Sequence, residues 1–301
     1  MRILTKFALG AIPALILLAP TPAFATAWGA WSYKISVHTQ PYGWTDYCLR
    51  AGMVDVASNR VDMQTRTNTA GCSGAAKNVP SGYMGGKVSG YRSGAFCGTS
   101  SSLFTTSTTW GYMVSATMCS NPSGTQTFYT VGSGAIYSDG SGGGAVQYYW
   151  FSASSPSQSY QQRRGLIMMT RTQRGFNTWA AGLAFATAVV LTPVAVSLAA
   201  SSGPSKGPIP DTAFVPGQPI DREKVPDFIP ALDQSGVEVG FVDKNLAIPE
   251  GERIGEDRDI PVYAADLTTV VGRMVPGKGF VPAGKPDSAV RDIPVTTEQQ
   301  G

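Results

Sequence analysis

Residues 163–201 read RRGLIMMTRTQRGFNTWAAGLAFATAVVLTPVAVSLAAS, and they divide the chain into two halves of different composition. The 26 residues from Gly175 to Ala200 carry no charge. At about 1.5 Å of rise per residue, a helix of that length crosses a hydrocarbon core of about 30 Å. The stretch therefore predicts a basic linker over 161–174 and one hydrophobic helix over 175–200, with flanking halves that fold independently of each other.

Two interpretations of the 175–200 segment stay open. In the first it is a membrane span that stops export, although the four arginines between 163 and 174 would then lie outside, against the positive-inside rule. In the second it is an internal export signal, with a basic region ending at Arg174, an apolar region over 176–191 and a cleavage site at Ser197-Leu198-Ala199. The second interpretation implies that two exported proteins are joined in this chain.

The amino-terminal residues 1–25 have the pattern of a secretory signal peptide. Arg2 and Lys6 precede an apolar run, and Ala23-Phe24-Ala25 is a small-x-small cleavage site. We therefore expect an exported protein, extracellular or in the cell envelope, and anchored to a membrane if 175–200 spans it. Export places the chain in an oxidising compartment.

Residues 26–160 contain every cysteine of the chain, and an even number of cysteines in an exported domain favours disulfides. The four residues, Cys48, Cys72, Cys97 and Cys119, allow three pairings. We favour Cys48–Cys72 and Cys97–Cys119, because each closes a loop of about 25 residues around one strand-turn-strand unit. Zinc is disfavoured because the spacing contains no C-x2-C pair.

The same half shows the alternation of large and polar residues that is typical of β-strands. It is clearest in Trp31-Ser32-Tyr33-Lys34-Ile35-Ser36-Val37. Further strands are expected over 47–56, 61–66, 86–97, 111–119, 126–137 and 145–153, with glycine-rich turns between them. We predict a mainly β domain over 26–160, an antiparallel β-sandwich or small barrel stapled by two disulfides.

Two tryptophans are the candidate binding residues. Trp44 lies in the turn-like Pro41-Tyr42-Gly43-Trp44, and Trp110 follows a run of serines and threonines. Aromatic rings beside small hydroxyl residues suit a sugar-binding face, although such rings also fill β cores. A cell-wall polysaccharide or a protein is therefore the expected kind of partner.

The residues argue against several other functions. His38 is the single histidine, and it continues an alternating strand toward a turn, so we assign no catalytic residue. The sequence contains no metal-ligand or cofactor motif, since Gly272–Lys278 has the Walker A spacing but is followed by Gly279 instead of Ser or Thr. The 26–160 half has seven basic and four acidic residues, too small an excess for nucleic-acid binding.

Residues 201–301 differ in composition, with thirteen prolines and, over 202–301, sixteen acidic against ten basic residues. Few large apolar residues are present. We therefore expect a largely irregular, acidic, proline-rich tail with a small β-hairpin near 259–275, in which Pro261 lies on an edge strand.

The first half resembles small secreted β-rich proteins of actinobacteria that contain two disulfides. The residues that carry the resemblance are Val79-Pro80-Ser81-Gly82-Tyr83-Met84-Gly85, then Cys97 and Cys119 around a Ser/Thr-rich middle, and the aromatic closing strand. The resemblance implies a disulfide-stapled β fold and assigns no activity. The function expected from the sequence is thus a non-enzymatic exported protein that acts through its surface, with a carbohydrate-binding module as the alternative.

Overall fold

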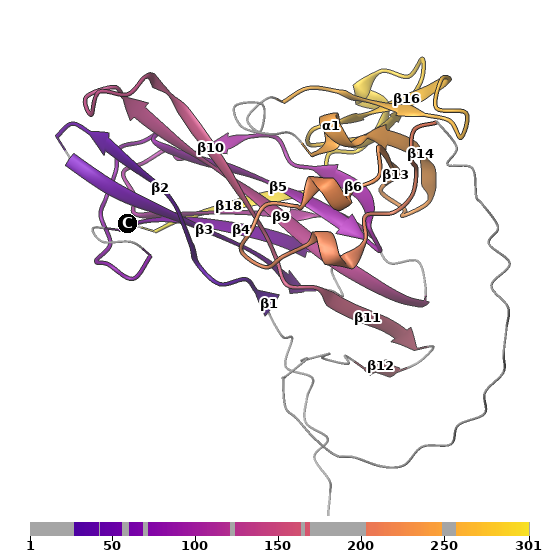
Figure 1. The fold of residues 1–301 in the computed structure, drawn as a ribbon, viewed down its shortest axis with the longest axis horizontal. Helices are drawn as coiled ribbons and strands as arrows, with labels where there is room; N and C mark the ends of the chain where they lie inside the picture. Colours follow the sequence, from indigo (N-terminus) through magenta and orange to yellow (C-terminus); the bar gives the residue numbers. More distant parts are fainter. Residues whose placement is uncertain are drawn as a thin grey trace, which may run out of the picture.

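Two β-sheets make up most of the structure (Figure 1). The computed structural model describes residues 27–41, 43–55, 60–68, 72–120, 124–163, 166–168, 203–248 and 257–300. The first sheet has six strands: β1 (Ala27–Trp28), β2 (Ser32–Thr39), β3 (Gly43–Asp55), β4 (Arg60–Asn68), β8 (Gly111–Thr117) and β18 (Val295–Gln300). Its order is β1-β3-β4-β8-β18, with β2 paired to β3, and all of these pairs are antiparallel.

The second sheet has twelve strands in the described part of the chain. The first half supplies β5 (Met84–Arg92), β6 (Ala95–Thr99), β7 (Leu103–Phe104), β9 (Gly124–Asp139), β10 (Val146–Ser154), β11 (Gln158–Arg163) and β12 (Leu166–Met168). The second half supplies β13 (Phe228–Leu232), β14 (Glu238–Asp243), β15 (Ile260–Tyr263), β16 (Val270–Val275) and β17 (Gly279–Pro282). The order is β12-β11-β9-β5-β6-β13-β14-β15-β16-β17, with β10 on β9 and β7 on β5.

The two sheets share one hydrophobic core. Leu49 of β3 and Val114 of β8 reach it from the six-stranded sheet, and Val88 of β5 and Ile136 of β9 reach it from the other. All four side chains are fully buried, and each stabilises the fold by about 1.5–3 kcal/mol. The alternation in the sequence marks these strands because inward residues must be apolar while their neighbours face away.

The expectation of a mainly β fold with antiparallel strands is confirmed, and most predicted strands lie within a few residues of the observed ones. The 86–97 segment differs, because it is two strands joined at Ser93-Gly94. Both residues have positive φ (47° and 76°), and two such residues form the tight turn of a β-hairpin.

Both disulfides are present in the pairing that loop length favours. Cys48 is bonded to Cys72 across 24 residues, and Cys97 is bonded to Cys119 across 22. In the second disulfide, Cys97 lies in β6 of the twelve-stranded sheet. Cys119 lies just after the end of β8 in the six-stranded sheet. It therefore ties the two sheets together.

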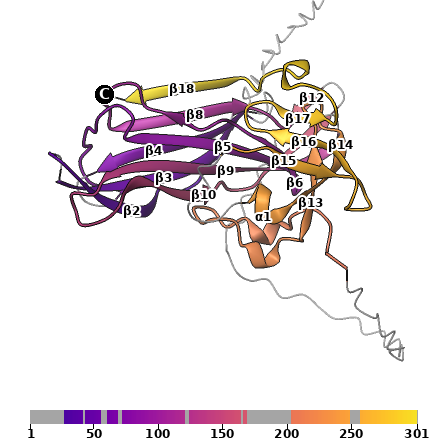
Figure 2. The ribbon, with the colours of Figure 1, turned by 90° about the horizontal axis from the view of Figure 1, so that it is seen from above.

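The 201–301 tail contains more β-structure than the single small hairpin that the sequence predicts. The expected hairpin exists as β15 paired with β16, but β13 to β17 also extend the twelve-stranded sheet and β18 completes the six-stranded one. Short helical segments connect these strands: η1 (Asp211–Ala213), η2 (Arg222–Lys224), α1 (Lys244–Ala247) and η4 (Asp287–Ala289). Figure 2 shows β18, in yellow, running beside β8.

A second hydrophobic core explains why this half is ordered. Ile209, Phe214 and Ile229 of the second half pack with Tyr91 and Tyr129 of the first. The 201–301 segment has few large apolar residues to bury against one another. Because it buries them against the first half instead, few large residues suffice, and the flanks of the 175–200 segment do not fold independently of each other.

The predicted signal peptide (1–25) and hydrophobic helix (175–200) lie outside the described residues, as does most of the 161–174 linker. Among the residues that are described, none belongs to a helix that has both the length and the apolar character to span a membrane.

Candidate functional site

The outer face of the twelve-stranded sheet carries the candidate site. Val88 and Ile136 point into the core between the sheets, so Lys87 on β5 and Tyr137 on β9 project from the opposite face. On β10, Tyr148 pairs with Tyr137, and Trp150 pairs with Ala135. Alternate residues of three neighbouring strands therefore meet on this face.

Five aromatic residues form a continuous group, which we call the aromatic strip. Phe104, Tyr137, Tyr148 and Trp150 lie on this face, and Tyr83 contacts Tyr137 at the end of the strip and also packs against the core between the sheets. Ring centroids are 5.0 Å apart for Tyr83–Tyr137, 5.3 Å for Tyr137–Tyr148 and 4.9 Å for Phe104–Tyr148. Phe104 and Trp150 meet edge to face at 6.2 Å. These tilted and edge-on contacts are the geometry that aromatic pairs prefer, and each contributes about 0.5–1.5 kcal/mol.

The backbone beneath the strip holds the rings in place. A Cβ at Gly85 would lie 2.4 Å from Phe104 Cδ1, so the Phe104 ring lies directly over this glycine. The Tyr148 hydroxyl donates to the Gly82 carbonyl at 2.9 Å. Burial, assisted by the neighbouring Tyr137, raises the pKa of Tyr148 and keeps this donor protonated. The ring of Tyr148 is thus fixed at its tip while 38% of the residue is exposed.

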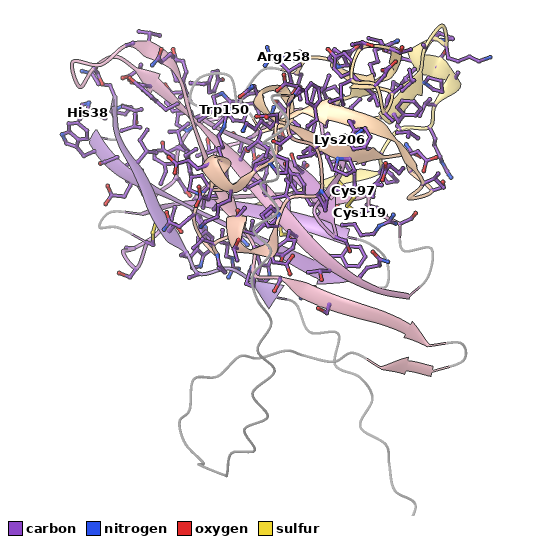
Figure 3. All side chains as sticks on the ribbon, turned by 45° about the vertical axis from the view of Figure 1, so that its right-hand side comes forward. His38, Cys97, Cys119, Trp150, Lys206 and Arg258 are labelled. Atoms are coloured by element: carbon purple, nitrogen blue, oxygen red, sulfur yellow. A yellow bond between two sulfur atoms is a disulfide. The ribbon has the colours of Figure 1, made fainter. Side chains whose placement is uncertain are left out.

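A charged pair borders the strip at Trp150. The Lys87 side chain is 7% exposed, and its Nζ lies 5.8 Å from the Trp150 ring centroid and 3.7 Å from Asp257 Oδ1. The Asp257 carboxylate also accepts from the Ser102 amide (2.8 Å) and hydroxyl (2.9 Å). Asp257 belongs to the second half, so both halves build this border. In the view of Figure 3, Trp150 lies between His38 on the left side of the molecule and Lys206 and the Cys97–Cys119 disulfide on the right.

The two tryptophans predicted from the sequence lie elsewhere. Trp44, in β3, is 62% exposed and packs edge to face with His38 at 5.4 Å, and its carbonyl accepts from Lys77 Nζ. Trp110 precedes β8, is half-buried, and donates its amide to the Gln300 carbonyl at 2.9 Å. Trp44 therefore has the exposure that a stacking platform requires, whereas Trp110 is half-buried and its backbone is bonded to the end of β18. Neither is part of the aromatic strip.

His38, Ser141 and Asp139 form a polar cluster at the tips of two hairpins. His38 Nδ1 and Ser141 Oγ are 2.7 Å apart. The Asp139 carboxylate accepts from the amides of Gln40 (2.7 Å) and Ser141 (2.9 Å). Hydrogen bonds from the Ser141 side chain and from these amides lower the pKa of Asp139 to about 2. In a catalytic triad the carboxylate orients the histidine. Here it orients the two turns, which gives the cluster a structural role.

Two other candidate sites can be judged from their geometry. Within the described ranges, no group of three or more His, Cys, Asp or Glu residues is placed to hold a metal ion. The Walker-like Gly272–Lys278 runs from β16 through a turn into β17, so no helix follows it to receive a phosphate. Lys278 instead pairs with Asp292.

A small hollow of about 180 Å³ lies where the two halves meet at the second disulfide. Its walls include Cys97, Cys119 and Met118 from the first half and Gln234 and Arg291 from the second. The lining is mainly apolar, and it marks the junction of the halves.

Part of the aromatic strip can be recognised in the sequence. Tyr148 and Trp150 alternate along a predicted strand, and alternation places them on the same face. Tyr83 and Phe104 come from a turn and a two-residue strand, and neither carries a local signal of its position. No protein-family model, curated protein or solved structure matches this chain.

Proposed function

We propose that this protein is an exported, non-enzymatic binding protein that holds a carbohydrate chain on the aromatic strip. The observation that carries the proposal is the state of Tyr148, whose hydroxyl is fixed to Gly82 while its ring stays partly exposed between Phe104 and Tyr137. A ring that is fixed before binding loses little conformational entropy when a ligand stacks on it.

The border of the strip supports a sugar over a purely apolar ligand. Sugars present apolar C–H faces and hydroxyl edges, and the strip offers rings beside the Lys87–Asp257 pair and the Ser102 hydroxyl. Ligand sites commonly combine aromatic walls with a few placed polar groups.

The proposal also includes a β-sandwich fold, export from the cell and a role in export or anchoring for the 175–200 segment. The two sheets with their shared core are in accord with a β-sandwich. Export through the 1–25 signal is in accord with two disulfides, which persist in oxidising compartments. The 175–200 segment is either a membrane anchor or an internal signal, and in both cases it would keep the protein at or beyond the envelope.

Retention on insoluble polysaccharides tests the proposal. We expect Tyr148→Ala and Trp150→Ala to lower the affinity about tenfold each, because each removes one stacking platform. Tyr148→Phe keeps the ring and loses the bond to Gly82, so its effect should be smaller. Circular dichroism checks that the variants are folded.

Trp44→Ala is the matched control, because it removes an exposed tryptophan outside the strip. Loss of retention in Trp44→Ala alone would move the binding site to the hairpin tips. Unchanged retention in folded Tyr148→Ala and Trp150→Ala would remove the strip as a carbohydrate site.

A further inference from the structure

The two halves of the chain complete each other at two sheet edges. Without the second half, the six-stranded sheet would end at β8, because β18 would be missing. The first-half strands of the twelve-stranded sheet would end at β6, because β13 would be missing. β18 covers the β8 edge over six residue pairs, from Val295↔Ala116 to Gln300↔Gly111. β13 pairs with β6 in parallel at Ala231↔Phe96. An unpaired edge is a template for a further strand, so these edges are specific acceptor surfaces.

Backbone hydrogen bonds outside the strands add to this pairing. The Ile209 amide donates to the Gly94 carbonyl at 2.9 Å, and the Gly277 amide donates to the Thr99 carbonyl at 2.9 Å. Ser154 exchanges bonds with 217–218 of the second half at 2.7 and 2.8 Å. Three separate segments of the first half, 94–99, 111–116 and Ser154, thus bind the second half through the main chain.

Side chains make the contact specific. The Phe214 ring stacks on Tyr129 with centroids 3.9 Å apart and planes inclined by 9°, and it meets Tyr91 at 5.5 Å. Arg92 is buried, and it donates to the carbonyls of Ser120 in the first half and Gly236 in the second. Truncating such a buried arginine or aromatic ring would leave unpaired polar groups or a cavity at the junction.

The net charges of the halves are also complementary. Residues 26–160 carry seven basic and four acidic side chains, whereas 202–301 carry ten basic and sixteen acidic ones. Opposite net charges favour the encounter of two chains and disfavour pairing of either half with its own copy.

The covalent connection runs through 169–202, and every contact described above lies outside it. The sequence of this connection has the pattern of an export signal with a cleavage site at Ser197-Leu198-Ala199. We propose that 203–301 is the protein partner of the 26–168 surface, and that the two pieces stay together as a two-chain complex when the connection is cut. The association does not depend on carbohydrate binding.

The experiment uses the full chain with a protease recognition sequence inserted between Ala200 and Ser201. The purified protein is cleaved, diluted to low micromolar concentration and analysed by size-exclusion chromatography and native mass spectrometry. The expected result is one species that contains both pieces. Separate elution of the two pieces would overturn the proposal.

Phe214→Ala provides the interface variant. While the chain is intact, the connection supplies a high effective concentration, so the variant should give the circular dichroism spectrum of the native protein. After cleavage, its pieces should associate about a hundredfold more weakly, because the stacked ring on Tyr129 is lost. Val270→Ala changes a residue that is 51% exposed on β16, and its cleaved form should stay associated as the wild type does. An equal affinity for Phe214→Ala and Val270→Ala would contradict the assigned surface.

Discussion

Single polar side chains connect hairpins that the strand pairing alone leaves separate. Asp139, at the end of β9, accepts from the amide of Gln40 in the β2–β3 turn, and Ser141 of the β9–β10 turn contacts His38. The aspartate also caps its own turn through the Ser141 amide. One carboxylate therefore fixes the conformation of one turn and its position relative to the other, and it does so most strongly while it is ionised.

The first prediction concerns the pH dependence of this contact. The pKa of Asp139 is lowered from 3.8 to about 2, first by the Ser141 side chain and then by the two amides. A lowered pKa in the folded state stabilises the fold above the ordinary value, and this contribution is lost as the pH falls through the folded value. Wild type should therefore be more stable than Asp139→Asn near neutral pH, with a difference that shrinks between about pH 4 and about pH 2.

Urea unfolding of both proteins across this pH range measures the difference. Asp46→Asn, in the same β2–β3 hairpin, serves as the comparison. A wild-type advantage over Asp139→Asn that stays constant from neutral pH down to about pH 2 would show that ionised Asp139 does not stabilise the turns.

At the scale of elements, the second disulfide lies where the sheets and the halves meet. Cys97 is in β6, which lies between β5 of the first half and β13 of the second. Cys119 follows β8, which lies between β4 of the first half and β18 of the second. Both cysteines are buried, whereas Cys72 of the other disulfide is half-buried. The sequence separations of 22 and 24 are nearly equal, so chain entropy predicts the same stabilisation for each, about 3 kcal/mol.

The second prediction compares the two disulfides. Replacing Cys97 and Cys119 by alanine should lower the free energy of unfolding by about 3–4 kcal/mol, and replacing Cys48 and Cys72 should lower it by about 2–3 kcal/mol. The excess arises because the first pair of substitutions also leaves a cavity at the junction. Urea denaturation followed by circular dichroism measures both values. Equal losses would mean that loop closure alone accounts for the effect of both disulfides, and a larger loss for Cys48 and Cys72 would contradict the prediction.

At the scale of the whole molecule, shared sheets couple the two halves. The second hydrophobic core needs rings from both, and each sheet contains strands from both. Loss of the second half would expose Tyr91, Phe96 and Tyr129 together with two strand edges. The free energy of these contacts is available only when both halves are folded.

The third prediction is a single cooperative unfolding transition. In a Trp179→Phe background, tryptophan fluorescence reports on the first half, because the other five tryptophans lie between residues 28 and 150 and 203–301 contains none. Hydrogen exchange followed by mass spectrometry reports on β13 and β18. We expect the same denaturation midpoint from both, since the second hydrophobic core is built from side chains of both halves and each sheet contains strands of both. Exchange of β13 and β18 at lower denaturant than the fluorescence change would show that the second half unfolds first.

The sequence predicts local features well and contacts between distant segments poorly. Alternation identifies β2, β4 and β9, but the tight turn at Ser93-Gly94 is missed because both residues also occur within strands. Tyr148 and Trp150 can be placed on one face from β10 alone. Phe104 joins them only because β7 pairs with β5 over Gly85, and no run of consecutive residues records that pairing.

The sequence by itself determined the mainly β class and the antiparallel strands, because these depend on residues near one another in the chain. It favoured, without deciding, the disulfide pairing that the structure shows. Only the tertiary structure decided that strands from 228–282 and 295–300 join both sheets and that the rings of the aromatic strip meet. The physical reason is that apolar side chains such as Phe214 and Ile229 become stable when they are buried against surfaces supplied by residues more than eighty positions away. Composition measures how many such side chains a segment has, and it does not record which distant surface covers them.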